Sequence, residues 1–484
     1  MSRSVDRIPT LVLALAGSVL VIASGMRWGV PPLAWIAPVP WMLWIRRTTC
    51  WRERLAILAV LALATVAQLT KIIPTVFALG FGLPMALGTW IVLLVWDALR
   101  RRTSEVHALY AWPALIVLSD WSSYTSGPMG VWGSGASTQP DNLALLQLAS
   151  LLGVAAIGAL MAWVASFAAA ALAAPGRSWW RHGVWLVLAL VAAFSFGVWR
   201  LSEPSQGPTV RAAAIVTDLG LFPDSLPSRE ALDANLETLF ERSARAADRG
   251  ARVIVWNEGA TIVERSDEPA VLARASAFAR EHSVDLVLAY IVPTSHEPFR
   301  FENLAVFIDD SGVERARYYK RHPVPGETEP SDNPVPRIER PYGVVSLAIC
   351  YDHDYPEMSR GHAGVGADLV LVPSSDWRGI DPIHTKLARV RAIEGGFSSI
   401  RPTRWAASAG FDPMGRIRGW MRVDEDNDRI LVTELPVTRR RTLYAMVGDA
   451  PVVASASLYL LVLLSLILHR WRQTSARRDN VGAA

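Results

Sequence analysis

Long apolar segments are the feature that most constrains what this sequence can fold into. A membrane-spanning helix needs about 20 mostly apolar residues. Eight segments approach or exceed that length, at residues 8–25, 29–45, 54–70, 73–98, 107–124, 143–173, 182–199 and 451–468. Charged residues are concentrated between the last two of them, and 51% of all residues are hydrophobic. The sequence therefore predicts a membrane domain, a soluble domain and one further spanning helix.

Two of these segments have unusual compositions. The first begins after Arg3 and Arg7 and ends near Ala23, as a signal peptide would, but the spans that follow it favour an uncleaved helix. The segment 29–45 is interrupted by four prolines, which makes it the weakest of the predicted spans.

Arginines between the predicted spans indicate an orientation. Short cytoplasmic loops are enriched in basic residues. With eight spans, the arginine clusters at 46–54, 100–102, 177–181 and 470–478 all fall on one side, and the loop 122–142 on the other side has no basic residue. The arrangement predicts cytoplasmic termini and an extracytoplasmic soluble domain. The net charge of +4 is accordingly interpreted as a topology signal, which gives no reason to expect a nucleic-acid partner.

The central region alternates between apolar strands and amphipathic helices, which is typical of one α/β domain. We expect helices at 229–250, 269–282, 356–364 and 383–395. We expect strands at 210–216, 253–256, 286–291, 304–309, 344–349, 369–372, 400–407 and 430–435. The turn Asp309–Gly312 is expected to close a hairpin.

Three candidate catalytic residues follow predicted strands or the hairpin. They are Glu258, Lys320 and Cys350. Sites in α/β domains are assembled at the carboxyl ends of strands. A thiol becomes a good nucleophile when a carboxylate acts as its base, and a lysine ammonium stabilises both a thiolate and an oxyanion. The chain has only one other cysteine, Cys50, so no disulfide framework is indicated.

At these residues the sequence resembles the nitrilase, or carbon–nitrogen hydrolase, superfamily. Its Glu–Lys–Cys order is present, in the motifs Trp256–Ala260, Tyr319–Glu327 and Ile349–Asp352. Within that superfamily, the surrounding spans and the stretches Trp112–Trp121 and Thr442–Pro451 are similar to the apolipoprotein N-acyltransferases. The resemblance implies a nitrilase-like α/β sandwich inserted between transmembrane helices.

The resemblance also implies a role for each residue. Cys350 is expected to be the nucleophile, Glu258 the general base and Lys320 the oxyanion stabiliser. Four more residues are expected to support the site or bind substrate: Glu327, Tyr351, Asp352 and Trp377. No cofactor or metal is expected. The implied partners are a phospholipid acyl donor and a lipoprotein amine, for a monomer embedded in the bacterial inner membrane.

The sequence departs from the family pattern around the expected pocket. Asp352 stands where glutamate is usual, Asn257 replaces a proline, and the stretch before Glu327 is one residue shorter. Three functions therefore stay open at this point. The first is acyl transfer to a lipoprotein or another amine, as in a diverged paralogue. The second is hydrolysis of a small amide or nitrile by a membrane-anchored enzyme, and the third is a non-catalytic binding role.

The expected domain boundaries follow from these segments. We expect a membrane domain of about seven helices at 1–200 and an extracytoplasmic nitrilase-like domain at 201–449. A transmembrane helix at 450–470 and a cytoplasmic tail at 471–484 are expected to follow.

Overall fold

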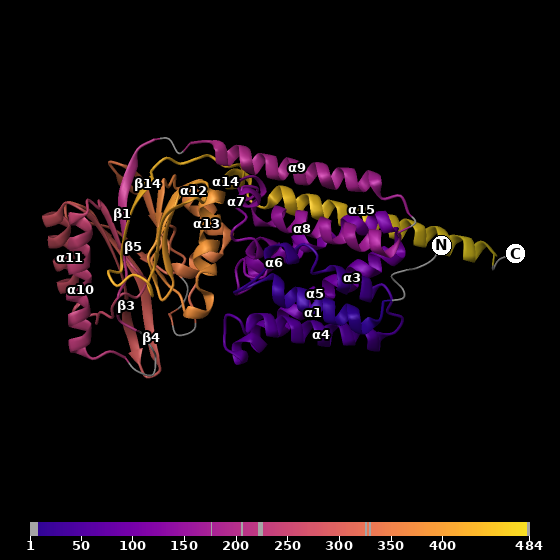
Figure 1. The fold of residues 1–484 in the computed structure, drawn as a ribbon, viewed down its shortest axis with the longest axis horizontal. Helices are drawn as coiled ribbons and strands as arrows, with labels where there is room; N and C mark the ends of the chain where they lie inside the picture. The colour runs from indigo at the N-terminus through magenta and orange to yellow at the C-terminus, as the bar shows by residue number, and fades with distance from the viewer. Residues whose placement is uncertain are drawn as a thin grey trace. The chain divides into compact units, whose positions relative to one another are not determined.

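The computed structural model describes residues 8–175, 177–204, 207–220, 226–324, 327–328 and 331–481 (Figure 1). Arg3, Arg7, Pro325 and Gly326 lie outside them. The chain divides into two compact units, one of residues 1–198 and 447–484 and the other of residues 199–446.

The first unit is helical. Its helices include α1 (Thr10–Ser24), α2 (Pro31–Ala34), α3 (Val39–Ile45), α4 (Trp51–Leu69), α5 (Thr75–Arg102), α6 (Glu105–Ser126), α7 (Leu143–Leu146), α8 (Ala149–Ala173), α9 (Trp180–Ser202) and α15 (Ala450–Val481). Within the described residues, α5, α8, α9 and residues 450–473 of α15 are long and apolar enough to cross a membrane. The remaining predicted spans coincide with shorter or more polar helices.

Prolines and a glycine shape these helices. The predicted span at 29–45 is broken into α2 and α3, because proline at positions 31, 32, 38 and 40 removes backbone donors. In α8 the helical path is interrupted at Leu152 and Gly153, and Gly153 has a φ of +72°, which glycine tolerates best.

The second unit contains two six-stranded sheets. One has the strand order β14-β1-β2-β3-β4-β5 and the other β13-β12-β10-β8-β7-β6. The strands of the first are β1 (Thr209–Ile215), β2 (Val253–Trp256), β3 (Asp285–His296), β4 (Phe299–Ile308), β5 (Glu314–Tyr319) and β14 (Ile430–Pro436). Those of the second are β6 (Ile338–Arg340), β7 (Gly343–Leu347), β8 (Leu369–Leu371), β10 (Ser398–Arg401), β12 (Ala407–Phe411) and β13 (Ile417–Arg422).

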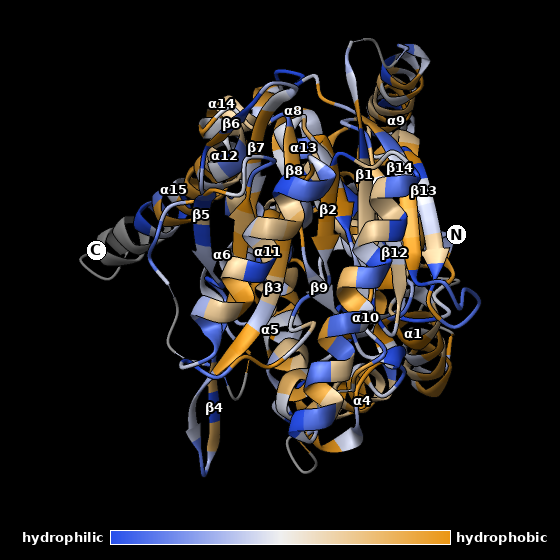
Figure 2. Cartoon of the chain, turned by 90° about the vertical axis from the view of Figure 1, so that its left-hand side faces the viewer, coloured by the Kyte–Doolittle hydropathy of each residue, from blue (hydrophilic) through white to orange (hydrophobic). Residues whose placement is uncertain are grey.

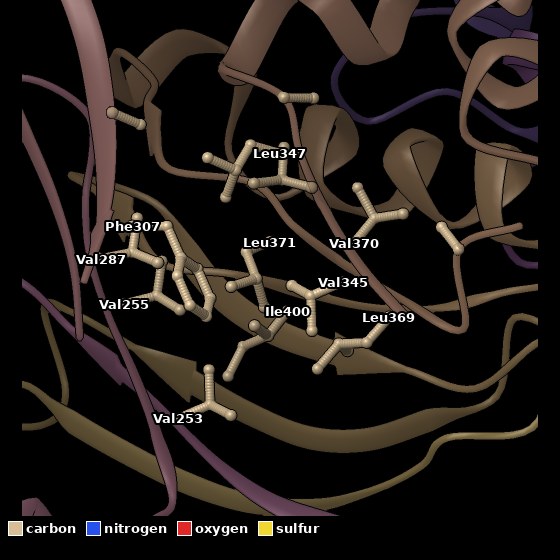
Figure 3. Packing of buried hydrophobic residues seen from close by; sticks show 14 of the residues in the cluster. Val253, Val255, Val287, Phe307, Val345, Leu347, Leu369, Val370, Leu371 and Ile400 are labelled. Atoms are coloured by element: carbon tan, nitrogen blue, oxygen red, sulfur yellow. The ribbon is translucent and has the colours of Figure 1, made fainter. Parts of the chain in front are cut away.

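Alternate residues of the central strands face opposite sides of the first sheet. Val253 and Val255 of β2 pack in one buried cluster with Leu347 and Ile400 of the second sheet, so the main core lies between the sheets (Figure 3). Ile254 belongs to a second cluster. Successive side chains of a strand point to opposite faces of the sheet, so a single strand contributes to both cores.

Helices cover the outer faces of both sheets. The pair α10 (Arg229–Asp248) and α11 (Glu268–His282) packs on the first sheet through the second cluster. In Figure 2 both helices carry alternating hydrophilic and hydrophobic bands, as expected of helices with one buried face. The pair α12 (Pro356–Gly364) and α13 (Ile383–Gly395) lies on the second sheet (Figure 1). The predicted α/β sandwich is confirmed.

One predicted strand is wrong in extent. The segment 400–407 is not continuous: β10 ends at Arg401, Pro402 follows, and Thr403–Arg404 form β11. This short strand pairs with β9 (Ser374–Ser375) outside both large sheets. Proline lacks an N–H and Trp405 has a φ of +58°, so the chain turns twice where the sequence pattern suggested one strand.

Candidate active site

The three candidate catalytic residues follow three strand ends, as predicted. Glu258 follows β2, Lys320 follows β5, and Cys350 follows β7. Strands β2 and β5 point the same way, because β2 is parallel to β3 and two antiparallel pairings then lead to β5. The structure brings the three side chains together: Lys320 bonds to Glu258, and the Cys350 thiol interacts electrostatically with both.

The Lys320 ammonium lies between two buried carboxylates. Its Nζ donates to Oε1 of Glu258 at 2.8 Å and to Oε1 of Glu327 at 2.9 Å. Nδ2 of Asn303 donates to the same two oxygens, at 2.7 and 2.6 Å. Glu327, expected as a supporting residue, thus lies beside Glu258 and Lys320.

Charge balance explains the protonation of this group. Burial alone would lower the pKa of Lys320, but Glu258 and Glu327 raise it above its ordinary value. Burial raises the pKa of Glu327, and the charge of Glu258 adds to the rise, while Lys320 and Asn303 oppose it. Lys320 is therefore a permanent cation shared by two carboxylates.

Cys350 occupies a constrained position. It begins the 3₁₀ turn Cys350–Asp354, its φ is +45°, and its N–H donates to the carbonyl of Pro373 at 2.8 Å. The side chain is only 6% exposed. Burial raises the pKa of the thiol well above its ordinary value, and the nearby Glu258 and Asp376 raise it further against Arg401 and Lys320. The thiol is therefore neutral at physiological pH.

Asp352 ties the turn after Cys350 to the loop after Lys320. One carboxylate oxygen accepts from the N–H of Ile349 at 3.0 Å and from the Tyr318 hydroxyl at 2.8 Å. The other accepts from the backbone N–H groups of Arg321 and His322, at 3.1 and 2.9 Å. Asp352 is therefore buried between the loops that carry Lys320 and Cys350 and holds them together, rather than lining an open pocket.

The remaining two candidate site residues, Tyr351 and Trp377, differ in burial. The ring of Tyr351 is half-buried and lies edge-on to Tyr355, with ring centroids 5.5 Å apart. Trp377 is 47% exposed, so the structure leaves it at the surface, next to the buried Asp376. Nearby, His322 bonds to Asp352, and Glu394 accepts a hydrogen bond from Ser359 at 2.8 Å.

A second buried group of charges adjoins the thiol. The Cys350 Sγ lies 3.9 Å from Oδ1 of Asp376. Arg401 donates to both oxygens of Asp376, at 2.8 and 3.1 Å, and His384 Nδ1 lies 2.8 Å from Oδ1. The other nitrogen of His384 lies 3.1 Å from both oxygens of Asp354. Asp376, Arg401 and His384 therefore lie beside the turn Cys350–Asp354, and His384 bonds to Asp354 within that turn.

Four residues of the site are not among those predicted from the sequence: Asn303, Asp376, His384 and Arg401. A weak signal existed for Asn303, which is a polar residue leading directly into an apolar strand. His384 and Arg401 lie in elements that were predicted, but their sequence separation from Cys350 hid their proximity.

Cys350, Asp376 and His384 are of types that bind metal ions, and their ligand atoms lie within 4.8 Å of one another. Arg401 argues against a cation there, because its guanidinium occupies both oxygens of Asp376 and contacts His384 Nδ1 at 3.0 Å. A metal ion would have to displace a buried positive charge. We therefore assign this group to hydrogen bonding.

A cavity of about 170 Å³ adjoins the lysine–carboxylate pair. Its described lining residues are Glu302, Asn303, Tyr319, Lys320, Pro323, Glu327, Thr328 and Ser331. Cys350 is not among these lining residues. The cavity therefore gives small polar molecules access to Lys320 and Glu327 from that side.

The chain is similar in sequence to known proteins. Residues 223–444 match the family model described as carbon-nitrogen hydrolase. An apolipoprotein N-acyltransferase of Geobacter metallireducens is 24% identical, over 92% of this chain and 93% of its own length. One of Gloeobacter violaceus is 26% identical, over 90% of each chain.

The soluble domain also resembles solved structures. An amidase from Nesterenkonia sp. is 24% identical, with a TM-score of 0.40, and the match covers 51% of this chain and 95% of the amidase. The family model covers the soluble domain, and the curated relatives extend the similarity over the flanking helices. Residues 223–444 thus form a carbon-nitrogen hydrolase domain, and the chain as a whole is similar to the apolipoprotein N-acyltransferases.

Proposed function

We propose that this chain is an apolipoprotein N-acyltransferase, which moves an acyl chain from a phospholipid to the N-terminal amine of a lipoprotein. The observation that carries the proposal is the similarity to enzymes of that name over nine-tenths of the chain, including the apolar helices that a soluble amidase would not need. An enzyme whose donor and acceptor are both lipids benefits from being embedded in the membrane that contains them.

In the first step Glu258 takes the proton from the Cys350 thiol, and the sulfur attacks the ester carbonyl of the phospholipid. The tetrahedral intermediate then collapses to a thioester and expels the lysophospholipid oxygen, which takes the proton back from Glu258. The buried neutral thiol supports this order, because it reacts only when a base removes its proton.

In the second step the lipoprotein amine attacks the thioester. Glu258 accepts a proton from the amine nitrogen and returns it to the departing sulfur, which restores the resting enzyme. The products are an amide on the lipoprotein and free Cys350.

Lys320 is proposed to stabilise the oxyanion in both steps. An ammonium has three N–H donors, and Glu258 and Glu327 accept two of them among the described residues. The third donor is available to the developing charge. Glu327 and Asp352 are proposed to hold Lys320 and the catalytic turn in place, and Tyr351 and Trp377 to contact substrate.

The proposed arrangement in the cell follows from the arginine distribution. We place residues 1–200 and 450–470 in the inner membrane, residues 201–449 outside the cytoplasm and residues 471–484 inside it, with the enzyme acting as a monomer. The four long apolar helices support embedding in a membrane.

The test is mass spectrometry of a synthetic diacylated lipopeptide incubated with the purified full-length protein and phospholipid. We expect one acyl group to be added to the lipopeptide amine, and no addition with Cys350→Ala. Absence of transfer by the wild-type protein, together with hydrolysis of soluble amides, would overturn the proposal.

A further inference from the structure

The Cys350 thiol has a hydrogen-bond acceptor outside the three proposed catalytic residues. Its Sγ points to Oδ1 of Asp376 at 3.9 Å, within the range of a hydrogen bond that involves sulfur. Asp376 is 2% exposed and follows β9, whereas the proposed base follows β2. The thiol is therefore approached by two carboxylates from different elements.

Asp376 is held rigidly by its own partners. Arg401 binds both of its oxygens, and Arg401 Nη1 also donates to the hydroxyls of Thr385 and Thr403, at 2.7 and 2.8 Å. A guanidinium that forms bonds in two directions fixes the plane of a carboxylate. His384 holds Oδ1 from α13.

The charges in this group balance. Burial alone would lower the pKa of His384, but Asp354 and Asp376 raise it to about 9, so the imidazole is a cation at neutral pH. Burial would raise the pKa of Asp376, and Arg401 and His384 bring it below the ordinary value instead. Two carboxylates thus face two cations, and Asp376 is ionised when it faces the thiol.

Building on the proposed function, we propose that Asp376 is the positioning residue of the nucleophile: its carboxylate, fixed by Arg401 and His384, holds the S–H of Cys350 in the resting enzyme. The charged groups around this thiol are Glu258, Lys320, Asp376, Arg401 and His384. Asp376 adds negative charge, so it keeps the thiol protonated until the acyl donor enters and Glu258 removes the proton. No bond to carbon is made or broken by Asp376.

The test compares two reactions of the full-length protein carrying Cys50→Ser, which leaves Cys350 as its one thiol. The first reaction is alkylation of Cys350 by iodoacetamide across a pH series, and the second is acyl transfer to the lipopeptide. For Asp376→Asn we expect alkylation at pH 7 to rise by about tenfold, as for a thiol pKa one unit lower. We expect transfer to fall by about 100-fold, because the sulfur is misplaced.

A second variant should change the rate of Cys350 alkylation in the opposite direction. His384→Gln removes a cation and leaves Asp376 charged, so we expect slower alkylation at pH 7 than in the wild-type protein. A site that was merely loosened by substitution would be alkylated faster in both variants. Opposite changes are therefore specific to the electrostatic positioning of the thiol.

The control is Asp368→Asn, which also neutralises a carboxylate. Asp368 accepts from the backbone N–H groups of Val344 and Arg439. It lies just before β8, whereas Asp376 lies beyond the other end of that strand. Its alkylation profile should match the wild type. An unchanged or slower profile for Asp376→Asn, or the same acceleration in Asp368→Asn, would overturn the proposal.

If Asp376→Asn does not fold, His384→Gln decides alone, and unchanged or faster alkylation in that variant counts against the proposal. Alkylation needs no lipid. If the wild-type protein fails to acylate the lipopeptide, the proposed function is wrong. The alkylation rates of Cys350 would still test the role of Asp376.

Discussion

At the scale of single residues, the candidate site consists of ionisable side chains that are almost fully buried and paired. Removing a charge from water is costly unless a partner compensates it. Lys320 serves Glu258 and Glu327, and Arg401 serves Asp376. Such pairs make Glu258 and Cys350 dependent on neighbours such as Glu327 and Arg401, to which no reacting role is assigned.

Asn303 provides a direct test of this dependence. Asn303→Ala removes the donor shared by Glu258 and Glu327, so the pKa of Glu327, already raised by burial, should rise further. We expect acyl transfer to fall by about 10- to 100-fold and the acidic limb of the pH–rate profile to move to higher pH. A profile with the wild-type shape would contradict the assigned role of Asn303.

His384 gives the protein a predictable pH dependence of stability. Its pKa is about 9 in the folded protein, against 6.5 for an ordinary histidine. Because the folded pKa is raised, the stabilisation is complete below pH 6.5 and is lost as the pH rises through 9. The contribution is about 3 kcal/mol.

Thermal unfolding measured from pH 6 to 10 checks this expectation. The midpoint of the wild-type protein should fall more steeply above pH 6.5 than that of His384→Gln. Parallel curves for the two proteins would show that the histidine is not charged in the folded state.

At the scale of elements, the site depends on loops that join different strands. Asp352 bonds to Ile349, just before Cys350, and to Arg321 and His322, just after Lys320. The relative position of nucleophile and lysine is therefore set by one carboxylate that connects the ends of β5 and β7.

Asp352→Asn tests this connection with almost no change of size. The amide nitrogen cannot accept hydrogen bonds, so donors on one side of the group lose their partner. We expect a lower unfolding temperature and a loss of transfer of about 10- to 100-fold. Asp368→Asn, which loses a carboxylate away from the site, should lower stability without a comparable loss of transfer. Full activity in Asp352→Asn would rule out the connecting role.

Local patterns were sufficient to predict most of the domain. The bounds of β2, α12 and α13 agree with the sequence pattern, because each has a clear periodicity and a clear end. The proximity of Glu258, Lys320 and Cys350 was predictable because each follows a strand in a recognisable motif. The group around Asp376 was not found, since it joins residues from β9, α13 and β10 that only the packing of the sheets brings together. The break at Pro402 was missed because apolar residues continue beyond it.

At the scale of the whole molecule, the proposed topology places Cys50 and the soluble domain on opposite sides of the membrane. Cys50 is exposed and lies within the first arginine cluster. Glu237, on α10, has a side chain that is 61% exposed.

A membrane-impermeant maleimide applied to spheroplasts separates the two positions. Glu237→Cys in a Cys50→Ser protein should be labelled, whereas the native Cys50 should react only after the membrane is permeabilised. Buried Cys350 provides little background in either case. The reverse pattern would invert the orientation and remove the extracytoplasmic assignment.

The left-handed backbone of Cys350 bears on why a cysteine is kept at that position. A non-glycine residue with a φ of +45° costs about 1 to 2 kcal/mol relative to glycine. Selection for a durable fold alone would therefore favour glycine there, and Cys350→Gly should unfold at a higher temperature than Cys350→Ala. The thiol persists against that preference, as expected if reactivity rather than robustness determines which residue survives at the turn.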